Sequence, residues 1–347
     1  MKIANRHIGR EHPPFVIAEM SGNHNQSLER ALEIVDAAAE AGAHALKLQT
    51  YTADTITLDV SEGDFYIHDK TSLWAGTSLH RLYQQAYTPW EWHEPIFKRC
   101  QERGLICFSS PFDESAVDFL ESLNVPAYKI ASFELVHLPL ICKAAATGKP
   151  LIMSTGMATI AEIDDAVQAA RAAGCTDMTL LKCTSTYPAT PENSNLRTIP
   201  SMREIFECEI GLSDHTMGVG AAIAAVALGA SVIEKHFTLS RADGGVDSAF
   251  SMEPAELKLL IEETERAWLA MGQIAYGPRE AELKSLGFRR SLYIAQDIKA
   301  GETLTPENLR CIRPGHGLPP KFYDFFIGRK MNQSAKKGTP LTWHMVG

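Results

Sequence analysis

Residues 105–134 read LICFSSPFDESAVDFLESLNVPAYKIASFE, and this stretch decides the fold. A short apolar run at 105–108 ends in Ser109 and Ser110, and a second apolar run at 127–130 also ends in polar residues. Between them lies a segment that contains alanine, glutamate and leucine. Continuous apolar runs are typical of parallel strands buried on both faces, and the intervening segment predicts a helix. The stretch is therefore one strand–helix–strand unit of an α/β fold.

The same unit repeats along most of the chain. Helical patterns separate the apolar runs, and residues 28–41 form an amphipathic stripe that ends at Gly42, a typical C-cap. Eight strand–helix units over roughly 270 residues predict a (β/α)8 TIM barrel, which typically takes about 250. An open doubly wound sheet is less favoured, because no GxGxxG motif follows the first strand. The other predicted strands are 15–18, 45–48, 151–153, 179–181, 210–212 and 232–233.

Two segments depart from this repeat. Residues 51–88 form a long insertion after the second strand, and insertions of this length on a compact barrel usually form a lid or a binding loop. Residues 290–347 are rich in turns flanked by short apolar alternations, which indicates a small β domain. We therefore predict a barrel domain at 1–275, a linker at 276–289 and a C-terminal domain at 290–347.

Composition excludes several classes of protein. The 33 basic and 42 acidic residues give a net charge of −9, which disfavours non-specific nucleic-acid binding. The longest uncharged apolar stretch, 219–233, is shorter than the ~18 residues of a membrane span, and the N-terminal region has no apolar segment typical of a signal peptide. The seven cysteines are odd in number and include no CxxC pair, which predicts reduced thiols and a cytoplasmic location.

Polar side chains stand at the ends of the predicted strands, where barrel enzymes carry their chemistry. Lys47 and Lys129 would supply positive charge to a bound anion. Each serine there, taken alone, is better explained as a helix N-cap, but their shared position favours a site for a phosphate and a carboxylate. The serines that would donate hydrogen bonds to such an anion are Ser110, Ser132, Ser154 and Ser213.

Two histidines, His215 and His236, follow adjacent strands. A single histidine is more often a packed residue than a ligand, but this pair could share one divalent cation whose other positions hold water and substrate. Two chemistries remain open. One is a Schiff-base aldolase with Lys129 or Lys47 as the nucleophile, and the other is metal-assisted condensation of an enol phosphate with a carbonyl compound. The many anion donors and the paired histidines favour the second.

The motifs at these strand ends resemble the sialic acid synthase family. The resemblance covers essentially the whole chain, including a C-terminal antifreeze-like (SAF) domain, and its ordered set of motifs is more specific than any single match. The matching motifs are Glu19 with SGNH (21–24), KLQTY (47–51), SPFD (110–113), KIASFE (129–134), STGM (154–157), GLSDHT (211–216) and EKHFT (234–238).

This resemblance implies an enzyme that condenses phosphoenolpyruvate with an open-chain amino-sugar aldehyde and releases phosphate. It implies that the two lysines and four serines named above hold phosphoenolpyruvate, and that His215 and His236 bind Mn²⁺ or Mg²⁺. Glu19 and Gln49 would lie beside the metal-bound water and the reacting carbons, and with Glu134 and Asp247 they are the implied catalytic residues. The residues implied to contact the sugar are Glu134, Ser185, Tyr187 and Asp247, together with Arg313 from the C-terminal domain of the partner subunit, which implies a domain-swapped homodimer.

Within the family, the chain looks most like the enzymes that make pseudaminic acid, through its stretches YTPWEWH (87–93), GLICFSS (104–110) and VPAYK (125–129). Family members that make N-acetylneuraminate typically carry asparagine where this chain has Ser185, within CTSTYP (183–188). The shorter side chain favours a different sugar, 2,4-diacetamido-2,4,6-trideoxy-altrose. Because that sugar lacks the 6-hydroxyl and has a second acetamido group, the pocket is expected to be more apolar. N-acetylneuraminate or legionaminate synthesis is the alternative within the family. A non-catalytic carbohydrate-binding or ice-binding protein is the alternative from another class.

Overall fold

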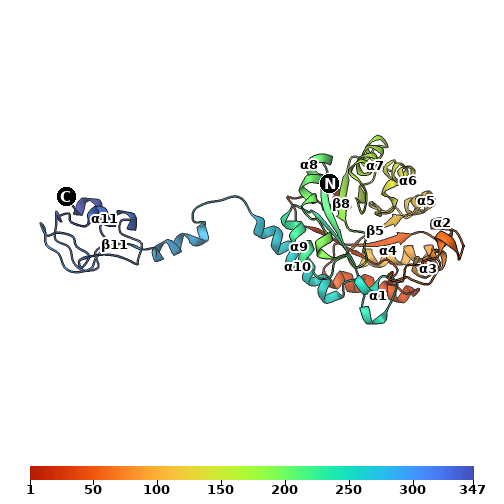
Figure 1. The fold of residues 1–347 in the computed structure, drawn as a ribbon, viewed down its shortest axis with the longest axis horizontal. Helices are drawn as coiled ribbons and strands as arrows, with labels where there is room; N and C mark the ends of the chain where they lie inside the picture. Colours follow the sequence, from red (N-terminus) through yellow and green to blue (C-terminus); the bar gives the residue numbers. More distant parts are fainter. The chain divides into compact units, whose positions relative to one another are not determined.

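The computed structural model describes residues 1–347 as two compact units, Met1–Gly272 and Gln273–Gly347. In the first unit, eight parallel strands close into a barrel in the order β10-β3-β4-β5-β6-β7-β8-β9, with helices around them (Figure 1). The predicted (β/α)8 TIM barrel is confirmed. Its strands are β3 (Phe15–Glu19), β4 (Ala45–Thr50), β5 (Ile106–Pro111), β6 (Tyr128–Ile130), β7 (Leu151–Ser154), β8 (Met178–Cys183), β9 (Glu209–Asp214) and β10 (Val232–His236).

Helices follow the strands, and several of them begin or end at a residue whose type favours helix capping. Ser27 and Asp113 cap α1 and α5 by accepting hydrogen bonds from backbone N–H groups of the first turn. Gly42 ends α1 in the left-handed conformation (φ 91°), which glycine adopts without steric cost. The helices of the barrel unit are α1 (Leu28–Ala41), α2 (Ala53–Ile56), α3 (Leu79–Ala86), α4 (His93–Glu102), α5 (Glu114–Ser122), α6 (Leu138–Ala145), α7 (Ile160–Ala172), α8 (Thr198–Phe206), α9 (Gly220–Ala227) and α10 (Pro254–Met271).

The barrel has two apolar layers. Alternate strand residues such as Val16, Leu46 and Ile130 face the helices and belong to the larger core. The inward residues form a smaller cluster that includes Ile17 and Ile152, and the N-terminal hairpin of β1 (Lys2–Ile3) and β2 (Arg6–His7) adds Ile3 and Ile8 to it. This second layer fills the barrel interior towards the N-terminal ends of the strands.

Inward-facing residues change from apolar to polar along each strand. Ile17 is followed two residues later by Glu19, and Ile152 by Ser154. Because side chains in a strand alternate with a period of two, these polar groups stay inside the barrel and gather at its C-terminal end. Gly211 has a steric role here, since an added Cβ would lie 2.4 Å from the Val232 carbonyl oxygen.

The insertion at 51–88 is folded rather than an open loop. It contains α2 and α3, and residues Tyr66 and Ser78 form an isolated antiparallel bridge between them. Backbone hydrogen bonds of 3.0 Å, from Ile67 N to the Thr77 oxygen and from Gly76 N to the Ile67 oxygen, close this hairpin-like turn. The segment is therefore an ordered part of the barrel unit.

The second unit has its own apolar core. It contains the antiparallel pair β11 (Ser291–Ile294) and β12 (Leu309–Ile312) and the short helix α11 (Tyr323–Phe326). Leu292 and Leu309 are buried in this core. In neither unit does a helix combine the length and the hydropathy that crossing a membrane requires.

Candidate active site

A cavity of about 500 Å³ opens at the C-terminal ends of the barrel strands, a volume typical of small-molecule sites. Ser110 and Ser185 do not line the cavity, but each contacts a residue that does. Lys47 Nζ donates to Ser110 Oγ (3.2 Å), and the Ser185 and Ser132 hydroxyls are 2.8 Å apart. Arg313 lies in the second unit and is exposed. The predicted residues that line the cavity are Glu19, Lys47, Gln49, Lys129, Ser132, Glu134, Ser154, Tyr187, Ser213, His215, His236 and Asp247.

Two buried lysines and two buried carboxylates form the floor of the cavity. Lys47 Nζ is 2.6 Å from Glu19 Oε2 and 3.7 Å from Glu234 Oε1. Lys129 Nζ is 3.6 Å from the same Glu234 oxygen. All four side chains are nearly inaccessible to solvent. Glu234 therefore lies between the two ammonium groups and holds them about one cavity.

Burial and charge act in opposite directions on these groups. Burial raises the pKa of Glu19 to about 7 despite the opposing effect of Lys47. For Glu234, burial raises the pKa, but the two lysines outweigh it and hold this pKa below its usual range. Burial lowers the pKa of Lys47, but Glu19 and Glu234 outweigh it and raise this pKa. Glu234 is thus the more strongly ionised carboxylate, and Glu19 can exchange a proton near neutral pH.

Hydroxyl groups around this floor have free hydrogen-bonding capacity. Ser154 Oγ is buried and has no hydrogen-bond partner in the chain, while Ser213 Oγ donates a long hydrogen bond (3.4 Å) to Glu234. Buried polar atoms normally have partners, so an unpartnered hydroxyl facing a cavity indicates a ligand. With the lysines nearby, that ligand is expected to be an anion.

The two histidines meet at the side of the cavity, with ring centroids 5.3 Å apart. His215 Nδ1 is 2.9 Å from the carbonyl oxygen of Thr184, so Nδ1 carries the proton and Nε2 has a free lone pair. His236 Nδ1 is buried without a hydrogen-bond partner, and burial lowers the pKa of His236 so that its ring is neutral. Burial lowers the pKa of His215, but Cys183 beside it outweighs this effect and raises the pKa, so a cation shared by the two rings would displace a proton from His215, whereas His236 is already neutral. The chain brings no third histidine, cysteine or carboxylate into a three-ligand cluster with them.

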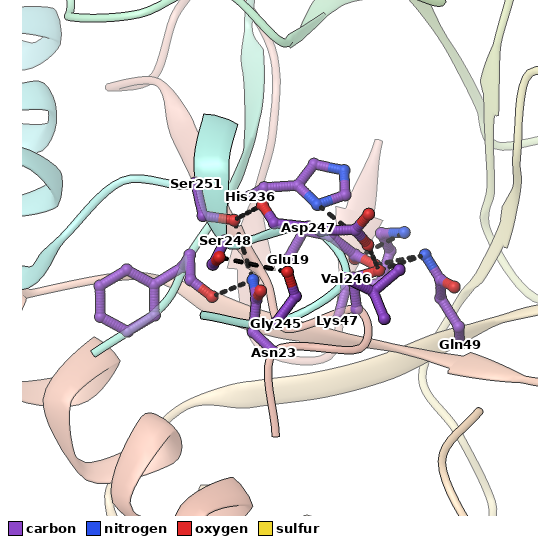
Figure 2. A network of polar contacts seen from close by, with 12 residues as sticks. Glu19, Asn23, Lys47, Gln49, His236, Gly245, Val246, Asp247, Ser248 and Ser251 are labelled. Atoms are coloured by element: carbon purple, nitrogen blue, oxygen red, sulfur yellow. Dashed lines mark hydrogen bonds and ion pairs between the residues drawn. The ribbon is translucent and has the colours of Figure 1, made fainter. Parts of the chain in front are cut away.

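A polar network joins Asp247 to the first strand (Figure 2). Ser21 Oγ donates to Asp247 Oδ2, and Gln49 Nε2 donates to both Ser21 Oγ (3.1 Å) and Glu19 Oε1 (3.0 Å). Asp247 Oδ2 also lies 4.0 Å from His236 Nδ1. The network therefore connects the candidate metal ligands with Glu19 on the cavity floor.

Asn23 fixes the backbone of the loop that carries Asp247. Its Nδ2 donates to the Phe237 carbonyl oxygen (2.9 Å) and to Ser251 Oγ (2.8 Å), while the Ser251 hydroxyl donates to the Asp247 carbonyl oxygen (2.7 Å). Figure 2 shows these contacts beside the Asp247 side chain. The buried amide thus holds both the end of β10 and the loop after it.

Glu134 and Tyr187 also line the cavity. Burial raises the pKa of Glu134 to about 7, and its buried Oε2 has no hydrogen-bond partner. The Tyr187 ring packs against His215 with 4.6 Å between centroids. Both side chains leave polar atoms available to a neutral ligand such as a sugar.

Several lining residues were given no role by the sequence reasoning. Glu234 belongs to the matching EKHFT motif but has no role assigned from it. Trp74 lies in the insertion at 51–88, for which only a lid or a binding loop is predicted. Cys183 is predicted only as a reduced thiol, and it lines the cavity. The alternation of inward residues could have identified Cys183, which is two residues after the inward Leu181.

Comparisons with known proteins match both units of the chain. The model of the NeuB family matches residues 34–276, and that of the SAF domain matches residues 289–347. A pseudaminic acid synthase of Helicobacter pylori is 46% identical over 332 residues, which cover 95% of this chain and 97% of that protein. A pseudaminic acid synthase of Campylobacter jejuni is 45% identical over 327 residues, covering 94% of this chain and 95% of that protein.

A solved structure shows the same architecture. The N-acetylneuraminic acid synthetase of Leptospira borgpetersenii, crystallised with citrate, is 32% identical, with a TM-score of 0.73. The superposition covers 82% of this chain and 94% of that chain.

Proposed function

The chain belongs to the NeuB family, and we propose on that basis that it is a pseudaminic acid synthase. It would condense phosphoenolpyruvate with the open-chain aldehyde of 2,4-diacetamido-2,4,6-trideoxy-β-L-altropyranose, giving pseudaminic acid and phosphate. The observation that carries the proposal is the pair of buried lysines around Glu234 at the floor of the cavity. Together with the unpartnered hydroxyl of Ser154, they form a preorganised binding site for a small polyanion, the anion receptor.

Phosphoenolpyruvate would displace the internal ion pairs of this receptor. The ammonium groups of Lys47 and Lys129 pair with Glu234 in the free protein. On binding, they would instead pair in part with the phosphate and the carboxylate of phosphoenolpyruvate. Ser154, Ser132, Ser213 and Ser110 would add hydrogen bonds. Because these groups stand on rigid strands, little reorganisation is needed on binding, and the enol carbon is held in a fixed position.

A divalent cation, Mn²⁺ or Mg²⁺, would be held by His215 and His236, and it would polarise the aldehyde oxygen of the sugar as a Lewis acid. Thr184 orients the His215 ring for this through its carbonyl oxygen. Asp247 lies near enough to His236 to contact the same region of the substrate. Glu134 and Tyr187 would contact sugar hydroxyls, with Ser185 beside them.

The reaction forms a carbon–carbon bond and a carbon–oxygen bond to water, and it breaks the carbon–oxygen bond to phosphate. Of the two protons of water, one reaches the alkoxide left on the sugar and the other leaves with the hydrogen phosphate. The enol carbon attacks the aldehyde carbon, and the cationic centre left on phosphoenolpyruvate is stabilised by its phosphate and by a nearby carboxylate. Water adds to that centre, and the tetrahedral intermediate expels phosphate. Glu19, with a pKa of about 7, can take the proton from the adding water, and Gln49 holds Glu19 through its amide.

We further infer that the enzyme acts as a domain-swapped homodimer in the cytoplasm. Arg313 is exposed on the second unit, so it is free to reach the sugar in the barrel of a partner subunit. The seven cysteines form no disulfide, which supports a reducing compartment.

The test is a phosphate-release assay with phosphoenolpyruvate and a panel of amino sugars, with and without Mn²⁺. Release that depends on the 2,4-diacetamido-2,4,6-trideoxy sugar and on metal is the expected result. Faster release with the sugars of N-acetylneuraminate or legionaminate synthases would favour those activities. A Schiff-base aldolase would stay active in EDTA and be trapped by borohydride. A non-catalytic carbohydrate-binding protein would release no phosphate with any sugar.

A further inference from the structure

The cavity has two chemically different sides. Its floor carries the lysines, carboxylates and histidines described above. Other residues of the lining are apolar, and about half of these come from one segment, the insertion at 51–88. The aliphatic and tryptophan side chains that this insertion places on the cavity are Ile56, Ile67, Trp74, Leu79 and Leu82.

Trp74 presents only carbon to the ligand. Its indole N–H donates to the carbonyl oxygen of Val246 (2.9 Å), so the polar atom of the side chain is already used. The ring lies 6.0 Å from the Tyr187 ring, centroid to centroid. Trp74 therefore connects the apolar insertion to the loop of Asp247 and closes the space between them.

This apolar side is preformed. Across the turn that carries Trp74, the Gly76 N–H donates to the Ile67 carbonyl oxygen and the Ile67 N–H donates to the Thr77 carbonyl oxygen. At the base of the insertion, the Tyr51 ring packs edge-on against Phe112 and Tyr83, at 5.0 and 5.8 Å between centroids. The side chains can then select among ligands by shape, because they need not rearrange to accept one.

We propose that Trp74, Ile67 and Leu82 form the receptor for the C6 methyl group of the sugar and set specificity for a 6-deoxy substrate. This inference rests on the proposed function. The lysines fix phosphoenolpyruvate at the floor, so the aldehyde carbon of the sugar must lie there and the other end of its carbon chain must lie away from the floor. A methyl group gains from contact with carbon surface, whereas a hydroxymethyl group would lose its water without finding a partner there.

The expected discrimination is measurable. A hydrophobic pocket that distinguishes one small group typically does so by about 10- to 200-fold in kcat/KM. We therefore expect wild type to prefer the 6-deoxy sugar over its 6-hydroxy analogue by at least about tenfold. Trp74→Ala and Ile67→Thr should each reduce that preference by about tenfold, mainly through the 6-deoxy sugar, while the KM for phosphoenolpyruvate stays unchanged.

The matched control is Leu73→Ala, because Leu73 precedes Trp74 but is 51% exposed and does not line the cavity. This variant should keep the wild-type ratio. Circular dichroism checks that each variant is folded. If Trp74→Ala unfolds, Ile67→Thr provides the same test. If the ratio of kcat/KM values for the two sugars is unchanged in an active Trp74→Ala or Ile67→Thr enzyme, this inference is overturned and the proposed function still stands. Wild type that releases no phosphate with the 6-deoxy sugar overturns the proposed function, and the inference with it.

Discussion

Lys235 and Asp214 form a buried ion pair, with 2.9 Å between Nζ and Oδ2 and about 2% of each side chain exposed. The two residues are directly paired in the register of β10 and β9. Each is the chain neighbour of a candidate metal ligand, Lys235 of His236 and Asp214 of His215. The ammonium group also donates to the Thr216 carbonyl oxygen, while Asp214 accepts from Thr216. The pair thus fixes the backbone on both sides of the histidines from the outer face of the barrel.

Replacing Lys235 with methionine should weaken both the fold and metal binding. Asp214 would be left buried without its counter-charge, which typically costs about 3–5 kcal/mol in unfolding free energy. Urea denaturation measures this loss, and the electron paramagnetic resonance signal of free Mn²⁺ measures the affinity. The matched control is Lys143→Met: its pair with Asp118 (2.7 Å) is far more exposed, so less than about 1 kcal/mol and no change in affinity are expected. Equal effects of the two substitutions would contradict the positioning role.

Removal of either histidine should abolish metal-dependent turnover without unfolding the barrel. His215→Ala and His236→Ala each delete one of the two imidazoles that face each other at the cavity. Mn²⁺ titration by calorimetry should show lost binding in both, with far-ultraviolet circular dichroism unchanged. Normal metal-stimulated phosphate release by either variant would rule out the assigned ligands.

Ser154→Ala should separate ligand binding from stability. The Ser154 hydroxyl is buried and has no partner in the chain, so its removal should not lower the unfolding free energy and should raise it by up to about 1–3 kcal/mol. A hydrogen bond to a charged ligand is worth about 1.5–3 kcal/mol, which predicts a KM for phosphoenolpyruvate raised by roughly ten- to a hundredfold. Steady-state kinetics and thermal denaturation check the two halves. The control, Ser109→Ala, removes a fully buried hydroxyl 2.6 Å from that of Thr50, and it should lower stability instead.

Glu134 gives the stability of the enzyme a defined pH dependence. Burial raises its pKa to about 7 from an ordinary value of 4.5, so its protonated form favours the folded state. That contribution is present in full below pH 4.5 and is lost as the pH rises towards 7 and above. Glu134→Gln should therefore match wild type near pH 4 and exceed it by up to about 3 kcal/mol at pH 8. Chemical denaturation across this range measures the difference in unfolding free energy between the variant and wild type. The contributions of other titrating groups are the same in both proteins and cancel in this difference. A constant difference at all pH values would refute the raised pKa.

The fold and much of the site follow from local patterns in the sequence. A period of two in short apolar runs places Glu19, Lys47 and Ser154 inside the barrel, and the rule that strand ends carry the chemistry gathers them without any knowledge of tertiary contacts. The role of Glu234 could not be predicted in this way, because it depends on the position of Glu234 between two lysines from other strands. The role of Trp74 could not be predicted either, since its indole contacts Val246, which is 172 positions away in the chain.

Arg313→Ala tests whether a second subunit completes the site. Loss of the contact of Arg313 to the sugar should raise the KM for the sugar more than the KM for phosphoenolpyruvate, because the residues proposed to hold phosphoenolpyruvate lie within the barrel unit. Mixing Arg313→Ala with His236→Ala subunits sharpens the test. In a domain-swapped dimer, one site of the mixed dimer combines an intact barrel with an intact arginine, so activity should return to about a quarter of wild type after random subunit exchange. An arginine that served its own barrel would give a site that is damaged in every subunit, and mixing would restore nothing.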